Sequence, residues 1–258
     1  MKVMQKGRSR VSNYILMFIV GIFVFSSVIA MPQPAQAATS KRIIASGTKY
    51  ATDLYVIKSG VPGPVVMIVG GVHGNEPAGY KAAALVKSYS IKKGTLIVIP
   101  QANKRAVAAH RRSIGGADLN RDFPTSRSDR PDSTMATAIF NVVKNYDVDW
   151  LIDMHEGINY QKVKSSTSVG QSLIYYPDTQ TKTIATKIVN SLNNGIKTSY
   201  KDFSLLRYPV SGSLASASAK VLGVNSFIFE SCTKDPLSTR INYQLKAANM
   251  LLSHLNMK

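Results

Sequence analysis

Histidine and glutamate side chains follow apolar runs at three points of this chain, and their types and spacing could do chemistry. His73 and Glu76 lie three positions apart in the glycine-rich stretch 70–79 (GGVHGNEPAG), directly after the apolar run 65–69 (VVMIV). Glycines let the backbone turn sharply there. Imidazole and carboxylate groups both bind zinc at about 2.0–2.2 Å, so one tight turn can direct both at the same ion. The stretch therefore predicts a metal site.

The other two points carry His155 and Glu230. His155 belongs to the segment 153–157 (DMHEG), which follows the apolar run 150–152, and Glu230 ends the apolar run 226–229 (SFIF). In open α/β sheets the carboxyl ends of the strands form the binding crevice. Each residue alone could equally cap a helix or pair with a lysine. All three glutamates of the chain and two of its four histidines share this position, however, and the set favours a functional site.

His73, Glu76 and His155 together would form a His₂Glu zinc site with an open fourth position, which is typical of catalytic zinc. Zinc lowers the pKa of a bound water towards about 7, and a nearby carboxylate can take the proton. Glu230 is the better candidate for this base. Glu156 directly follows a ligand, so on an extended backbone its side chain should point away from that ligand.

Short apolar runs alternate with helix-like segments along the chain. This alternation predicts a single α/β domain with a central mixed β-sheet flanked by helices. The expected strands are 65–69, 95–99, 150–152, 173–176 and 226–229, and the expected helices are 78–88, 135–144, 181–192 and 240–255. The stretch 101–131 lacks a periodic pattern, and long irregular segments in compact domains tend to be functional.

The N-terminus differs from the rest of the chain. Four basic residues precede a seventeen-residue apolar run at 14–30, and the segment ends in Ala35-Gln36-Ala37. This is the pattern of a secretory signal peptide, so residues 1–37 are expected to be cleaved and the protein to be secreted or associated with the cell wall. The alternative is an uncleaved anchor that holds the domain outside the cytoplasm. Residues 38–49 would be a leader or linker, or else an edge strand, before a catalytic domain at 50–258.

The charge of the chain is strongly positive. The formal net charge of the 258 residues is +18, and cleavage after residue 37 would leave 221 residues with +14. Such a charge favours anionic surroundings, for example an acidic cell-wall polymer. The lysines are spread out and no aromatic ladder accompanies them, so nucleic-acid binding is not expected. Cys232 is the single cysteine, which excludes an intramolecular disulfide, and we expect it to be a buried small residue.

Four motifs in order resemble those of the zinc carboxypeptidase superfamily, which also includes the succinylglutamate desuccinylase and aspartoacylase group. The motifs are HGNE at 73–76, DLNRDFP at 118–124, DMH at 153–155 and FIFE at 227–230. Together they extend over most of the chain after residue 37. The resemblance implies one zinc ion per chain, bound by His73, Glu76 and His155, and it implies that Glu230 is the general base and then the proton donor.

The resemblance also implies roles for residues around this centre. Asn120 and Arg121 would hold a substrate carboxylate, for which a planar guanidinium is well suited. Arg111 would polarise the scissile carbonyl and stabilise the oxyanion, although the adjacent Arg112 leaves this assignment open by one position. Asp118 would accept a hydrogen bond from His73 and fix its tautomer.

Tyr208 resembles the mobile tyrosine that closes over the terminal carboxylate of a carboxypeptidase substrate. The alternative for Tyr208 is an ordinary half-buried tyrosine. The segment after it (211–219, SGSLASASA) contains no aspartate that would select basic side chains. Little more than one helix follows Glu230, whereas aspartoacylase-type enzymes usually carry an additional C-terminal β region.

Three functions remain open from the sequence. The first is an exported zinc metallocarboxypeptidase that hydrolyses a peptide or peptide-like amide next to a free carboxylate, with cell-wall peptides as an attractive substrate. The second is a zinc deacylase of N-acyl amino acids. The third is a non-catalytic, basic binding domain at the cell surface, which the presence of Glu230 disfavours because a degenerate site most readily loses its base.

Overall fold

The structure is a computed structural model that describes residues 37–258. The expected signal peptide, residues 1–37, lies outside the described residues except for its last position. Among the described helices, none combines the length and the apolarity that a membrane span requires.

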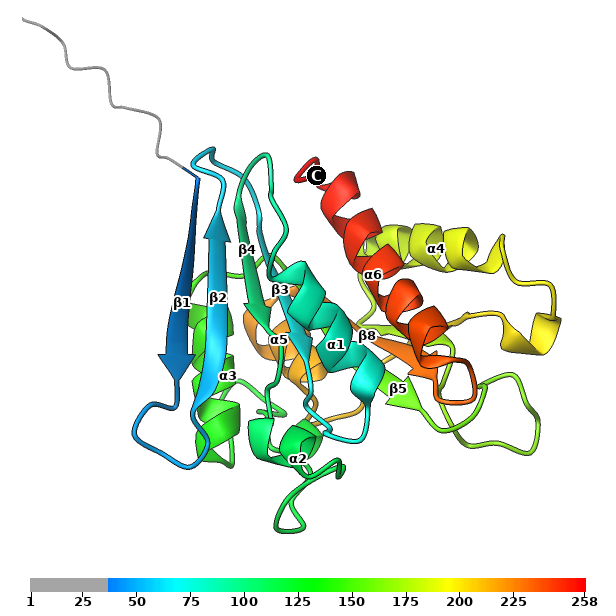
Figure 1. Cartoon of the computed structure of the whole chain (residues 1–258), viewed down its shortest axis with the longest axis horizontal. Helices are drawn as coiled ribbons and strands as arrows, with labels where there is room; N and C mark the ends of the chain where they lie inside the picture. The colour runs from blue at the N-terminus through cyan, green and yellow to red at the C-terminus, as the bar shows by residue number, and fades with distance from the viewer. Residues whose placement is uncertain (1–36) are drawn as a thin grey trace, which may run out of the picture. The chain divides into compact units, whose positions relative to one another are not determined.

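Eight strands form one mixed sheet in the order β1-β2-β4-β3-β5-β8-β6-β7 (Figure 1). Strands β3, β4, β5 and β8 pair in parallel, as do β6 and β7, whereas β1, β2 and the β6–β8 pair run antiparallel to their neighbours. The strands are β1 (Ala38–Ile44), β2 (Thr52–Lys58), β3 (Val65–Gly70), β4 (Thr95–Ile99), β5 (Trp150–Gly157), β6 (Ser172–Tyr175), β7 (Ser204–Arg207) and β8 (Asn225–Cys232). The predicted α/β fold with a central mixed sheet is confirmed.

Segment 38–49 contains β1, which pairs with β2 over its whole length at one edge of the sheet. Of the two alternatives for this segment, the structure therefore has the edge strand rather than a loose leader. The sheet begins at Ala38 and not at residue 50, where the catalytic domain was expected to start.

Helices cover both faces of the sheet (Figure 1). Residues of α1, α4 and α6 pack on one face and residues of α3 and α5 on the other. The helices are α1 (Pro77–Val86), α2 (Lys104–Ala108), α3 (Thr134–Asn145), α4 (Thr179–Asn193), α5 (Leu214–Leu222) and α6 (Leu237–His254), with short 3-10 turns η1 (Leu119–Arg121) and η2 (Ser199–Lys201).

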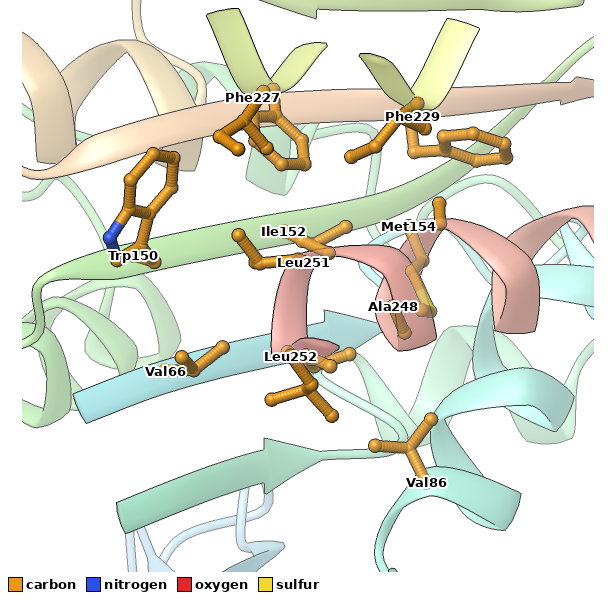
Figure 2. Close-up of a cluster of buried hydrophobic side chains, with 14 of the residues drawn as sticks. Val66, Val86, Trp150, Ile152, Met154, Phe227, Phe229, Ala248, Leu251 and Leu252 are labelled. Atoms are coloured by element: carbon orange, nitrogen blue, oxygen red, sulfur yellow. The ribbon is translucent and has the colours of Figure 1, made fainter. Parts of the chain in front are cut away.

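The core beneath α1 and α6 is built from alternate residues of the central strands. Figure 2 shows side chains of β5 and β8 meeting α6 there, and all are nearly or fully buried: Trp150, Ile152, Met154, Phe227, Phe229, Ala248, Leu251 and Leu252. Successive side chains of a strand point to opposite faces. The residues between them on β5 and β8 therefore face α3 and α5, and His155 and Glu230 are among these.

The strongly apolar strands and the longer helices lie where the sequence predicts them, within a few residues. Four elements were missed: β2, β7, α2 and α5. Helix α5 consists largely of alanine and serine (LASASAKVL), which give little periodic contrast. Strand β5 extends to Gly157, so His155 lies within the strand rather than after it. Cys232 is buried as expected.

Candidate active site

The loop between β3 and α1 holds His73 and Glu76 by close backbone contacts. Gly71 has a φ of +70°, which favours glycine, and its carbonyl accepts a 2.8 Å hydrogen bond from the backbone N–H of Asn103. A Cβ atom on Gly74 would lie 2.0 Å from the backbone of Ala106. The loop therefore packs directly against α2, which fixes both side chains.

His155 and Glu230 come from neighbouring strands. They are directly opposite each other in the parallel pairing of β5 and β8, so their side chains share one face of the sheet. His155 is 1% exposed and Glu230 is 8% exposed. The two strand ends thus place a histidine and a carboxylate side by side, and both side chains are almost completely shielded from solvent.

His73, Glu76 and His155 converge on one point. The Nδ1 atom of His73 lies 2.8 Å from Glu76 Oε1, and the Nδ1 atom of His155 lies 2.8 Å from Glu76 Oε2. The two Nδ1 atoms are 3.1 Å apart. The candidate ligand atoms of these three buried residues all lie within 4.8 Å of one another.

The outer nitrogen of each histidine faces a carboxylate. His73 Nε2 is 2.8 Å from Asp118 Oδ1, so Asp118 occupies the position expected for it. His155 Nε2 is 3.1 Å from Asp153 Oδ2, an ion-pair distance without good hydrogen-bond angles. We assign this pair as the contact because Asp153 is fully buried and a buried carboxylate requires a partner.

These contacts test whether a cation fits the site. A carboxylate at Nε2 favours the tautomer with the proton on that nitrogen, which leaves the lone pair of each Nδ1 directed inward. Two lone pairs and the Glu76 carboxylate would then converge without a proton among them. Such an arrangement is repulsive unless positive charge sits between the groups. A metal ion can supply it, and without an ion an additional proton on His155 does, so the residues fit a metal ion.

Burial and charge perturb the ionisable groups of the site in the metal-free protein. Burial alone would raise the pKa of Glu76, but the contacts with His155 and His73 outweigh it and lower the pKa to about 2. Burial would lower the pKa of His155, but Asp153 and Glu76 raise it well above its usual value. Burial raises the pKa of Glu230 to about 8; the charge of His155 opposes this rise, and Glu76 and Asp153 add to it. Perturbed carboxyl groups of this kind are typical of functional sites.

A cavity of about 420 Å³ opens over this group of residues. Its polar lining includes the three candidate ligands, Glu156 and Glu230, together with Arg112, Asn120 and Arg121. Its other walls are mostly apolar or carry hydroxyl groups: Ile158, Thr167, Ser168, Val169, Ile174, Val210 and Ile228. A larger groove of about 690 Å³ lies on α6 and contains none of these residues.

Of the two adjacent arginines, Arg112 is the one that lines the cavity. Its guanidinium donates to Asp118 Oδ2 at 2.9 Å and to Glu76 Oε1 at 3.4 Å. Arg111, the residue first assigned to the oxyanion, does not line the cavity and contributes its backbone instead, because its carbonyl accepts a hydrogen bond from Gly74 N–H at 3.0 Å. The oxyanion role itself stays a prediction, and of the two adjacent arginines the structure places only Arg112 in the cavity.

Asn120 and Arg121 line the cavity from η1, which places them where a substrate carboxylate could bind. Asn120 is buried, and its Oδ1 accepts from the backbone N–H of Leu214 at 3.3 Å. Tyr208, in contrast, is 62% exposed and does not line the cavity. Its φ of +61° turns it towards Tyr176, whose ring centroid is 6.1 Å away. The expected carboxylate-closing position of Tyr208 is not the one in this structure.

Sequence reasoning missed two features of the cavity. The first is the set of contacts of Glu156. The sequence indicates only that its side chain points away from His155, whereas the residue lines the cavity and is hydrogen-bonded to α1 and α6. The second is the apolar wall, which comes from the β5–β6 loop, β6, β8 and the loop before α5. These segments are far apart in sequence, so no local pattern identifies them as one surface.

The fold of the protein is zinc carboxypeptidase-like. The catalytic-domain model of the succinylglutamate desuccinylase/aspartoacylase family matches residues 62–245, and the chain belongs to that family. None of the curated proteins matches the chain significantly.

Solved structures share the fold at low sequence identity. Product-bound cell shape determinant protein Csd4 from Helicobacter pylori is 20% identical, with a TM-score of 0.65 over 86% of this chain and 56% of that chain. A succinylglutamate desuccinylase/aspartoacylase from Rhodobacter sphaeroides is 17% identical, with a TM-score of 0.59 over 86% and 65% of the two chains. A candidate metallopeptidase from Shewanella amazonensis is 16% identical, with a TM-score of 0.66 over 84% and 87%. The chain thus spans about half the length of the Csd4 structures it matches.

Proposed function

We propose that this protein is an exported zinc-dependent metallocarboxypeptidase that hydrolyses a peptide or peptide-like amide next to a free carboxylate. The observation that carries the proposal is the convergence of His73 Nδ1, His155 Nδ1 and the Glu76 carboxylate in a cavity that also holds Glu230 and Arg121. This reaction needs a metal site, a general base and a positively charged side chain that binds the substrate carboxylate.

The residues of the chain divide the reaction between them. His73, Glu76 and His155 would hold zinc, which supplies Lewis acidity that activates water and polarises the scissile carbonyl. Glu230 would take a proton from the attacking water and return it to the leaving amine. Arg112 would donate hydrogen bonds to the oxygen on which negative charge develops. Asn120 and Arg121 would orient the substrate through its free carboxylate.

The charges of the cavity favour a substrate whose terminal residue, the one that bears the free carboxylate, has an uncharged side chain. Every acidic residue of the cavity is already engaged: Glu76 at the metal, Glu230 as base and Glu156 with Arg240. The remaining walls are mainly aliphatic, so a lysine side chain would lose its hydration without gaining a partner.

Export and the location at the cell wall rest on the N-terminal segment and on the positive charge. The charge of +14 after residue 37 favours an anionic polymer around the substrate. Helicobacter pylori Csd4 is described as a D,L-carboxypeptidase and has been solved with mDAP and with a tripeptide. Its fold is shared here, which supports a cell-wall peptide as substrate.

Family membership favours a second candidate function, a zinc deacylase of N-acyl amino acids. Both reactions can use the same metal ligands, base and carboxylate clamp. They differ in the acyl side of the amide, which is a peptide in one case and a small acyl group such as acetyl or succinyl in the other.

A substrate panel separates the two functions. We expect the zinc-loaded protein to release the terminal amino acid from short peptides that end in alanine or leucine. Release should be at least about tenfold slower when the peptide ends in lysine, because an unpaired buried charge costs well over 1 kcal/mol. Peptides with an amidated terminus should be inert. Hydrolysis of N-acetyl or N-succinyl amino acids alone would establish the deacylase instead.

Two adjacent arginines provide a matched pair for testing the oxyanion assignment. Arg112→Met should lower kcat by a factor of about 10²–10³, the usual effect of removing one oxyanion donor. Arg111→Met should leave kcat within about twofold, because only the backbone of Arg111 contacts the site. Steady-state kinetics with both variants decide the matter, and the reverse order of effects would restore Arg111 to the role.

A further inference from the structure

Helix α6 reaches the ends of both strands that carry the active site. Arg240 and Gln244, one turn apart on this helix, direct their side chains at β5. The Arg240 guanidinium donates to Glu156 Oε1, and Gln244 Nε2 donates to the carbonyl oxygen of His155 at 2.8 Å. Gln244 Nε2 also lies 3.3 Å from Ser231 Oγ on β8. One helix thus holds the backbone of a candidate ligand and the carboxylate next to it.

Glu156 extends these contacts to Glu76. Glu76 is the N-cap residue of α1, yet its side chain makes no capping hydrogen bond to its own helix. The Glu156 carboxylate caps α1 instead, because its Oε2 accepts from the backbone N–H of Ala78 at 2.7 Å. The backbone N–H of Glu156 also donates to Glu76 Oε2 at 3.0 Å. An N-terminal N–H of a helix needs an acceptor, and Glu156 supplies it from another strand.

We propose that Glu156, Arg240 and Gln244 are positioning residues for the metal ligands. Glu156 caps α1 in place of Glu76, which leaves the Glu76 carboxylate for the ion, and Arg240 holds Glu156 in that position. Gln244 holds the backbone of His155. This inference rests on the proposed metal binding by His73, Glu76 and His155.

Because the ion pair between Glu156 and Arg240 is buried, the position of the Glu156 carboxylate depends strongly on Arg240. The Glu156 side chain is fully buried and the Arg240 side chain is 11% exposed. A buried carboxylate that loses its cation must reorient towards another partner, because an unpaired buried charge is costly. Reorientation would weaken the cap on Ala78 and shift the loop that carries Glu76. Contacts behind metal ligands typically change metal affinity or activity by about 10–100-fold.

The test compares three variants with a control on the same helix. Arg240→Met removes the cation, Glu156→Gln keeps the shape but offers one acceptor oxygen instead of two, and Gln244→Met removes the donor to His155. Lys246→Met is the control, since Lys246 anchors α6 to the carbonyl of Ser191 on α4, away from the site. The zinc dissociation constant of each full-length protein is measured by competition with a chelator, and the melting temperature of each metal-free protein is measured separately.

We expect the zinc dissociation constant to rise about 10-fold or more in the three variants and to stay within about twofold in Lys246→Met. In the zinc-loaded variants kcat should fall while KM stays nearly constant, and Arg240→Lys should restore part of the affinity by returning the charge. If Arg240→Met does not fold, Glu156→Gln and Gln244→Met decide the question. Folded variants with unchanged zinc affinity, or an equal loss in Lys246→Met, would overturn the inference. Wild-type protein that binds no zinc would instead contradict the proposed function.

Discussion

Glu230→Gln is expected to lower kcat by a factor of about 10²–10⁴, the range for losing a general base. The glutamine side chain has nearly the same shape but cannot accept a proton from water. Because the proposed ligands are His73, Glu76 and His155, the variant should still bind one zinc ion per chain. The measurements are kcat on a peptide substrate and zinc content of the purified protein. Undiminished turnover with zinc in place would show that another group is the base.

The pH dependence gives this prediction a second measurement. Glu230 must be deprotonated to accept a proton, so kcat/KM should fall as the pH decreases through the pKa of Glu230. Burial raises that pKa to about 8 in the metal-free protein, and a cation bound beside it would lower the pKa because opposite charges favour the carboxylate. The acidic limb of the wild-type profile should therefore lie below pH 8 and should be absent from the residual activity of Glu230→Gln. An identical limb in the variant would assign it to a different group.

The elements of this protein that could be predicted from the sequence are those whose buried faces produce an apolar run or a periodic apolar pattern. Strands β3, β4, β5 and β8 are covered on both faces, so they contain continuous apolar runs, and the polar residues towards their carboxyl ends stand out. His73, Glu76, His155 and Glu230 were identified in this way. The periodic faces of α3, α4 and α6 were equally clear, because each packs against one layer of the sheet.

The parts that could not be predicted depend on irregular backbone. The stretch 101–131 has no period, so sequence alone could not decide which of Arg111 and Arg112 turns into the cavity; a φ of +50° at His110 is one of the turns that sets their direction. Tyr208 has a φ of +61°, a conformation that no local pattern announces for a tyrosine. Glu156 was correctly expected to point away from His155, but its contact with Arg240 spans 84 positions. Such contacts are set by the packing of α6.

His155→Gln is expected to abolish stoichiometric zinc binding and, with it, the stabilisation that zinc gives the wild-type protein. A ligand that binds only the folded state at a free concentration 100 times its dissociation constant adds about 2.7 kcal/mol to the free energy of unfolding. The wild-type melting temperature should therefore rise clearly when zinc is added to the metal-free protein, and that of the variant should not. Thermal unfolding with and without zinc, together with metal analysis, gives the result. His110→Gln is the matched control, because His110 is exposed and lies outside the cavity.

The metal-free state of His155→Gln separates zinc binding from a general loss of folding. His155 is the strongest favourable partner of the buried Glu76 carboxylate and holds its pKa down to about 2 against the effect of burial. Without that partner the pKa of Glu76 should rise. The stability that the ionised carboxylate contributes above its unfolded pKa would then be lost at a higher pH than in the wild-type protein as the solution is acidified. A variant that is folded at neutral pH, unfolds more readily in acid and is not stabilised by zinc would support both roles of His155. These roles are to bind the zinc ion and to keep the Glu76 carboxylate ionised. Full stabilisation by zinc in the same variant would place the ion elsewhere.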